Sequence, residues 1–194
     1  MTKSIDFYFD FISPYSYFAH KKIKIIKKNK DIIFNYKPIL LGGLHNLQGI
    51  TAPAFIKPKL KHMISDCDLI AKKNNFNFTW NSRFPINSLS IMRGYIFIET
   101  NVKDSYLDII FEAYWKDNQD ISDEEILKKL LGKCKIDSNS FFEGIKNPKV
   151  KNELKKITES AHDKEIFGAP SFLVNSKIFW GQDRLEFALN EYFK

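Results

Sequence analysis

Hydrophobic and polar residues alternate over residues 5–11, which predicts a β-strand because strand side chains point to opposite faces with a period of two. Ser13, a favoured N-cap, and Pro14, suited to the first helical position, then predict a helix that runs to about residue 29. A second strand is predicted over 31–36. This β-α-β opening, with a crossover of about 20 residues, is typical of a parallel, right-handed unit.

The middle of the chain changes to helical spacing, and we expect residues 53–162 to be almost entirely α-helical. Several helix starts are marked by residues typical of a helix N-terminus. They are Asn87, Asp104, Ser122 with the acidic residues that follow it, and Pro148. The clearest apolar stripe comprises Ile56, Leu60, Met63, Cys67, Ile70 and Ala71.

The end of the chain returns to strands. A loop over 167–170 precedes a strand at 171–174, and a two-residue turn leads to a return strand at 177–180, which together predict a hairpin. A last helix is predicted from about Asp183. The predicted order is therefore β-α-β, a run of helices, and β-β-α, which indicates an α/β protein.

Composition places the chain among ordinary globular proteins. It has 194 residues, of which 44% are hydrophobic and 27% charged, so a disordered or collagen-like chain is excluded. Its 18 Phe, eight Tyr and three Trp predict a core built on aromatic rings. The net charge of +7 comes from lysines scattered along the chain, a pattern that favours a solvated surface, and we predict no nucleic-acid partner.

The sequence contains no pattern typical of a disulfide framework, a metal site or a membrane span. Cys67, on the apolar stripe, and Cys134, at a helix end, are expected to be structural and cannot form a disulfide framework. Without a CxxC, Cys/His cluster or HExxH motif, no metal site is predicted. Asp6 and Asp10 interrupt any apolar leader, and no stretch approaches the ~18 uncharged apolar residues of a membrane span. We therefore expect a cytoplasmic protein without a membrane partner.

The turn from the first strand into the first helix is the strongest candidate for chemistry. A helix start presents unpaired N–H groups and the positive end of the helix dipole, which stabilise an anionic sulfur placed there. The turn carries Ser13 and Ser16, so dithiol redox chemistry is excluded at this position. The Ser13 hydroxyl either donates a hydrogen bond to the sulfur anion of a ligand or serves only as the helix N-cap.

The order of elements, with a Gly-Ala-Pro segment directly before a strand, resembles the thioredoxin fold with a helical insertion, as in the DsbA superfamily. In this resemblance Ser13 to Ser16 occupies the position of the C-x-x-C motif, and Pro170 is a cis proline that faces it. We therefore expect an α/β, thioredoxin-like fold with a large all-α insertion. The expected domains are a discontinuous thioredoxin-like domain, residues 1–45 and 163–194, and a helical insertion domain, residues 46–162.

A closer resemblance is to the family of 2-hydroxychromene-2-carboxylate isomerases and kappa-class glutathione transferases. Its motifs are spread over essentially the whole chain in the family's order, although residues 95–160 hold none of them. The two motifs nearest the C-terminus are together quite specific. The matching segments are 6–17 (DFYFDFISPYSY), 40–44 (LLGGL), 84–89 (FPINSL), 167–170 (FGAP) and 179–185 (FWGQDRL).

The resemblance implies reduced glutathione as cofactor or co-substrate, and it assigns roles to individual residues. Ser13 would contact the glutathione sulfur, and Ala169, just before Pro170, would pair its backbone with the cysteinyl part of the tripeptide. Lys59 falls near the family's lysine for the glycyl carboxylate. The γ-glutamyl end would be met at the start of the last helix, by a carboxylate for its ammonium and a cation for its carboxylate. The residues in this last part of the site are Trp180, Gly181, Gln182, Asp183 and Arg184.

Each of these assignments has a purely structural alternative. Asp183 suits the first turn of any helix, Trp180 suits packing beside a turn, and Lys59 suits an exposed surface. The loop over 48–53 departs from the family because it lacks the Asn that members often carry after its glycine. His45 either lines the pocket or, as we expect, is a solvated loop residue.

The resemblance implies an enzyme that acts on a small, electrophilic and aromatic substrate. In the favoured reaction, the glutathione thiolate adds to a conjugated carbon, a bond rotates in the adduct, and the thiolate leaves, which amounts to isomerisation. The same residues could perform conjugation. The alternative function is a non-catalytic DsbA-like module that lacks the dithiol and binds a peptide or protein at the Pro170 edge. A homodimer is the expected assembly.

Overall fold

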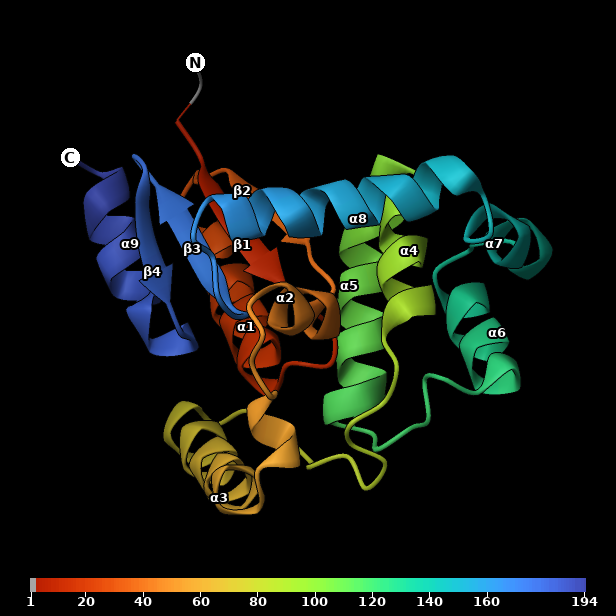
Figure 1. Ribbon diagram of the computed structural model, residues 1–194, viewed down its shortest axis with the longest axis horizontal. Coiled ribbons are helices and arrows are strands. Elements are labelled where there is room, and N and C mark those ends of the chain that lie inside the picture. Colours follow the sequence, from red (N-terminus) through yellow and green to blue (C-terminus); the bar gives the residue numbers. More distant parts are fainter. Residues whose placement is uncertain (1–2) are drawn as a thin grey trace.

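The computed structural model describes residues 3–194 and contains one four-stranded mixed sheet (Figure 1). Its strands are β1 (Ile5–Phe9), β2 (Phe34–Pro38), β3 (Ser171–Val174) and β4 (Lys177–Trp180), in the order β2-β1-β3-β4. β2 runs parallel to β1, whereas β3 and β4 are antiparallel to their neighbours. The sheet therefore joins the two ends of the chain, and the predicted hairpin near the C-terminus is confirmed.

The predicted crossover helix is confirmed as α1 (Pro14–Asn29), which leads from β1 to β2. The second strand, however, lies at Phe34–Pro38 instead of 31–36. Its position is set by its pairing with β1, in which Ile5 lies opposite Phe34 and Phe9 opposite Pro38. Because β2 is an edge strand, a proline without an N–H to donate is tolerated at its end.

Helices fill the chain between β2 and β3, as the apolar spacing predicts. α8 contacts α2, α4 and β2, so it leads the chain back from the helices to the sheet (Figure 1). The chain then ends in β3, β4 and α9. The helix bounds are α2 (Leu41–Leu47), α3 (Lys57–Asn74), α4 (Leu89–Phe97), α5 (Thr100–Trp115), α6 (Glu124–Lys133), α7 (Ser138–Gly144), α8 (Pro148–Asp163) and α9 (Leu185–Tyr192).

Two of the predicted helix starts are wrong by a few residues. α5 begins at Thr100, so Asp104 lies inside the helix and not at its N-cap. α6 is capped by Asp123 instead of Ser122, because the Asp123 carboxylate accepts a hydrogen bond of 2.9 Å from the N–H of Ile126. The predicted start of α8 at Pro148 is confirmed.

The interior is built on aromatic rings, as the composition predicts. Phe7 of β1 stacks on Phe172 of β3 with ring centroids 5.3 Å apart. The fully buried Trp115 of α5 donates its indole N–H to the carbonyl oxygen of Phe11 over 2.8 Å. This bond ties the helical part of the chain to the turn that follows β1.

One apolar core runs from the sheet into α5, α6 and α7. The division into a thioredoxin-like domain and an insertion of residues 46–162 stays a prediction, and its first boundary falls inside α2. Cys67 and Cys134 are both buried free thiols, which confirms their expected structural placement. Within residues 3–194, no helix has the length and apolar character to cross a membrane.

Candidate active site

Ser13 occupies the N-cap of α1, and its side chain makes two hydrogen bonds inside the protein. Its side-chain oxygen accepts a bond of 3.1 Å from the N–H of Ser16, and its hydroxyl donates a bond of 2.9 Å to the carbonyl oxygen of Ala169. The Ala169–Pro170 peptide bond is cis, so the prediction of a cis Pro170 that faces Ser13 is confirmed. Ser13 is therefore both a helix cap and the contact between the start of α1 and residues 167–170, which we call the proline loop.

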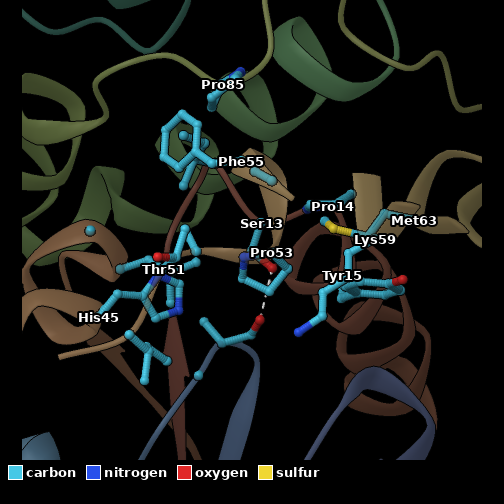
Figure 2. Close-up of a pocket in the computed structure, with 18 of the residues that line it drawn as sticks. Ser13, Pro14, Tyr15, His45, Thr51, Pro53, Phe55, Lys59, Met63 and Pro85 are labelled. Atoms are coloured by element: carbon cyan, nitrogen blue, oxygen red, sulfur yellow. Dashed lines mark hydrogen bonds between the residues drawn. The ribbon is translucent and has the colours of Figure 1, made fainter. Parts of the chain in front are cut away.

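A mostly apolar cavity of about 1220 Å³ opens beside Ser13. Figure 2 shows Ser13 between His45 and Thr51 on one side and Tyr15, Lys59 and Met63 on the other. Four parts of the chain that are distant in sequence supply the walls: the β1–α1 turn, residues 40–63, residues 84–88, and the proline loop with Trp180.

The cavity brings together several of the residues that the sequence singles out. Ser13, Lys59, Ala169 and Trp180 all line it, and Pro170 is buried next to Ala169. The indole of Trp180 covers the proline loop so closely that a Cβ at position 168 would lie 2.7 Å from its Nε1. These contacts support a shared site, while the role of each residue stays a prediction.

The segment after Trp180 lies outside the cavity lining. Gly181 has a φ of +111°, a conformation that favours glycine, and a 3-10 turn over Gln182–Arg184 leads into α9, so the last α-helix begins two residues later than predicted. Gln182 is buried, and its Oε1 accepts a bond of 2.5 Å from Lys22 of α1. Asp183 and Arg184 are exposed and form an ion pair of 3.0 Å. Binding to γ-glutamyl charges remains a prediction for this segment.

Asp10 is a site residue that the sequence analysis missed. Its carboxylate is fully buried and accepts hydrogen bonds from the N–H of Ile12 (3.1 Å), the N–H of Leu41 (2.8 Å) and the hydroxyl of Ser88 (3.1 Å). Burial raises its pKa from 3.8 to about 6, against the opposite effect of these three bonds. Ile12, Leu41 and Ser88 all line the cavity, so Asp10 fixes three of its walls to one another.

Ser88 occupies the N-cap position of α4, one residue after the predicted Asn87, but its side chain makes no capping hydrogen bond. Asn87 still serves the helix start, because its side-chain oxygen accepts a bond of 2.9 Å from the N–H of Leu89. The Ser88 hydroxyl is instead directed to Asp10. The hydrogen bond from Ser88 to Asp10 places the end of the 84–89 motif against the end of β1. Residues of both segments line the cavity.

His45 is the clearest correction to the expected site. It lies in α2, and not in a solvated loop, with 8% of its surface exposed, and it lines the cavity. Its Nδ1 is buried and has no hydrogen-bond partner among residues 3–194. Burial lowers the pKa of the His45 ring. The helical spacing of Leu40, Leu44 and Leu47 could have revealed this helix.

Known proteins with similar sequences identify the family of the chain. Residues 4–193 match the family model of the DSBA-like thioredoxin domain. The 2-hydroxychromene-2-carboxylate isomerase of Sphingobium xenophagum is 29% identical over 189 residues, which cover 96% of each chain. Glutathione S-transferase kappa 1 of Homo sapiens is 24% identical over 206 residues, which cover 96% of this chain and 89% of the relative.

The solved structures agree on the fold. A structure of 2-hydroxychromene-2-carboxylate isomerase superposes with a TM-score of 0.88 at 22% identity and covers 96% of this chain and 92% of its own. Together with the family match, this similarity confirms the predicted thioredoxin-like fold with a helical insertion.

Proposed function

The chain belongs to the family of DSBA-like thioredoxin domains, and on this premise we propose that it is a glutathione-dependent isomerase or kappa-type transferase. Its relatives with an isomerase or a transferase name match over nearly their whole length, which supports an enzyme of this class. The observation that carries the proposal is Ser13, a hydroxyl at the start of α1 that faces the cis-proline loop beside a large cavity.

Glutathione can bind through an exchange of hydrogen bonds at Ser13. In the free protein the Ser13 hydroxyl donates its hydrogen bond to the carbonyl oxygen of Ala169. When the ligand sulfur arrives, that hydrogen turns to the sulfur, and the Ala169 carbonyl accepts the N–H of the cysteinyl residue instead. Each broken bond is replaced, so neither group is left buried without a partner.

The start of α1 favours the ionised form of the bound sulfur. The unpaired N–H groups of the first turn carry the positive end of the helix dipole. In α1, which lies wholly within the described residues, the first turn contains no acidic side chain that would oppose a thiolate. A thiolate is the reactive nucleophile of glutathione, so this position supports both binding and reactivity.

The bound thiolate can then add to an electrophilic carbon conjugated to a carbonyl group. The sulfur–carbon bond forms, the C=C pair shifts, and the C=O pair moves onto oxygen to give an enolate. The former double bond can now rotate, and collapse of the enolate expels the thiolate, which completes an isomerisation. Protonation of the enolate instead retains the sulfur and completes a conjugation.

The size and lining of the cavity support two ligands side by side. Its volume of about 1220 Å³ exceeds the roughly 300–1,000 Å³ typical of a site for one small molecule. Its mostly apolar walls suit an aromatic second substrate, and Lys59 at its edge suits the glycyl carboxylate of glutathione. We further propose that Asp183 and Arg184 bind the charged groups of the γ-glutamyl end. A homodimeric assembly and a cytoplasmic location are also part of the proposal.

Titration with reduced glutathione tests the binding step. At a ligand concentration of one hundred times Kd, linkage should stabilise the fold by about 2.7 kcal/mol and raise Tm by roughly 5–10 °C. S-methylglutathione, which cannot ionise at sulfur, is the control for the rest of the tripeptide. If reduced glutathione at 10 mM leaves Tm unchanged, the proposed function fails.

A failure would favour the second candidate, a peptide-binding module. The exposed rings of Phe55, Phe167 and Trp180 along the cavity are the observation in its favour. In that case an unstructured peptide with apolar side chains should raise Tm where glutathione does not.

Ultraviolet absorbance of the thiolate tests the role of Ser13. A hydrogen bond to an anion and the helix dipole should together ionise bound glutathione about one to two pH units below the free thiol. Ser13→Ala should lose most of this difference while still binding the tripeptide. If glutathione bound to the wild type ionises at the same pH as free glutathione, Ser13 is a helix cap alone.

A further inference from the structure

His45 has hydrogen-bonding capacity that the protein does not use. It lies in α2, more than nine-tenths buried, and lines the cavity. Its Nδ1 is enclosed and has no partner among the described residues. Nε2 makes no hydrogen bond to residues 3–194 either. Because Nδ1 is enclosed and the ring lines the cavity, Nε2 is the ring nitrogen that remains to meet a ligand there.

The other buried polar side chains of the cavity are already satisfied. Ser13 bonds to Ala169 and Ser16, and Ser88 bonds to Asp10. His45 is therefore, within residues 3–194, the buried polar side chain of this cavity that still needs a partner. A buried polar group without a partner is costly. The enclosed Nδ1 cannot reach a ligand, so the ring can bond to one only through Nε2.

The chemical state of the ring follows from its surroundings. Burial lowers the pKa of His45, so the ring is neutral near pH 7. An enclosed N–H without an acceptor is rarer in proteins than an unfilled lone pair, which favours the lone pair on the enclosed Nδ1. The single proton of the neutral ring then lies on Nε2 and is offered to the cavity.

We propose that Nε2–H of His45 donates a hydrogen bond to the carbonyl oxygen of the second substrate, which is therefore a conjugated carbonyl compound. The inference rests on the proposed function. As the glutathione sulfur bonds to the conjugated carbon, the C=O pair moves onto oxygen, and the bond from Nε2–H strengthens with the growing negative charge. No proton is transferred in this step, and the charge returns to sulfur when the thiolate leaves.

Two substitutions of His45 distinguish the effect of losing the hydrogen-bond donor from the effect of changing the size of the side chain. His45→Leu removes the donor, whereas His45→Gln carries an amide N–H at a similar distance from the backbone. His162→Leu is the matched control, because His162 lies on α8 and is not among the residues that line the cavity. The electrophiles are trans-4-phenyl-3-buten-2-one, a conjugated ketone, and benzyl chloride, which reacts with a thiolate without charging an oxygen.

With the ketone, His45→Leu should lower kcat/KM about one hundredfold, since loss of one such donor costs roughly 10²–10³. His45→Gln should recover most of the loss, and His162→Leu should change little. With benzyl chloride, every variant should stay within about threefold of the wild type. Equal loss on both electrophiles, or no loss on the ketone, would overturn the proposal.

A second measurement tests the role of His45 even if the wild type turns over neither electrophile. In 15N-labelled protein at pH 7, the His45 ring should be the neutral Nε2–H tautomer, and its Nε2 resonance should move when the ketone is added without glutathione. The Nδ1–H tautomer, or an unmoved resonance at saturating ketone, would refute the proposal. Glutathione affinity from calorimetry is read separately, so failure of the proposed function and failure of the His45 role give different results.

Discussion

The free energy of unfolding should fall by about 2.4 kcal/mol between pH 4 and pH 7 through Asp10 alone. This is less than the full effect because the carboxyl of the unfolded chain is already partly ionised at pH 4. Asp10 is fully buried at the end of β1, and burial raises its pKa from 3.8 to about 6. The unfolded chain ionises this group near 3.8, so the folded state binds the proton more tightly. The resulting stability is complete below pH 3.8 and is lost as pH rises through 6, and a pKa difference of about two corresponds to about 3 kcal/mol.

Asp10→Asn isolates this effect because it removes the titration. One Asp10 oxygen accepts from Leu41 and Ser88 and the other from Ile12, so the amide NH2 of asparagine must face at least one donor. We expect a constant cost of roughly 1–3 kcal/mol from this mismatch. The difference between wild type and variant should therefore shrink by about 2.4 kcal/mol from pH 4 to pH 7, as the wild type loses stability through Asp10.

Urea unfolding followed by tryptophan fluorescence at pH 4, 5, 6 and 7 measures this difference. Asp31→Asn is the matched control, since Asp31 is exposed and its difference from the wild type should not follow the same course. If the Asp10→Asn difference is the same at every pH, Asp10 ionises alike in the folded and unfolded chain. The three hydrogen bonds would then balance the effect of burial, and the reasoning would fail.

Three further predictions concern ligand contacts and packing. Asp183→Ala should weaken glutathione binding about tenfold in calorimetry, the loss of one charged hydrogen bond, and should leave Tm without ligand unchanged because Asp183 is exposed. Lys59→Met should weaken glutathione binding by roughly two- to fivefold, as expected of an exposed ion pair, whereas Lys61→Met, outside the cavity lining, should leave it unchanged. Gly94→Ala would place a Cβ 2.3 Å from a buried aromatic ring and should cost about 1–3 kcal/mol in urea unfolding, whereas Gly132→Ala enters open space and should stabilise α6 by about 0.4–1 kcal/mol.

Local patterns predict the strands and most helices well because their signals lie within a few residues. Ser13 with Pro14 marks the start of α1, and the hairpin of β3 and β4 follows from its turn. The position of β2 depends on its pairing with β1, a contact across the chain. Strand pairing is invisible to a local pattern, so the predicted strand is displaced by two to three residues.

The missed helix α2 has a different cause. It is only seven residues long and contains Gly42 and Gly43, which are poor helix formers. The buried carboxylate of Asp10 accepts from the N–H of Leu41, and this contact satisfies the first turn of the helix. The decisive interaction comes from β1, about thirty residues earlier, so local propensity underestimates α2 and leaves His45 in a loop.

The residues of the candidate site also differ in whether the sequence could predict them. Ser13 follows from a local helix-start signal, and Pro170 opposite it follows from the resemblance of the element order to the thioredoxin fold. Asp10 appears in the sequence as one more polar residue of an alternating strand. Alternation assigns a residue to a face of a sheet, and only the folded chain reveals that α2 and α4 cover that face and bury the carboxylate.

The hydrogen bonds of Ser13 also indicate what this residue contributes to catalysis. In the free protein its hydroxyl is already satisfied by Ala169, so a ligand that takes this bond and returns one to Ala169 gains little affinity from the exchange. The thiolate form gains more than the thiol, because a hydrogen bond to an anion is stronger than one to a neutral sulfur. Ser13 should therefore set the ionisation of the bound sulfur far more than the affinity for the tripeptide. Under the proposed function, we expect the affinity to come from contacts along the rest of the peptide, at Lys59 and Asp183 and on the apolar walls.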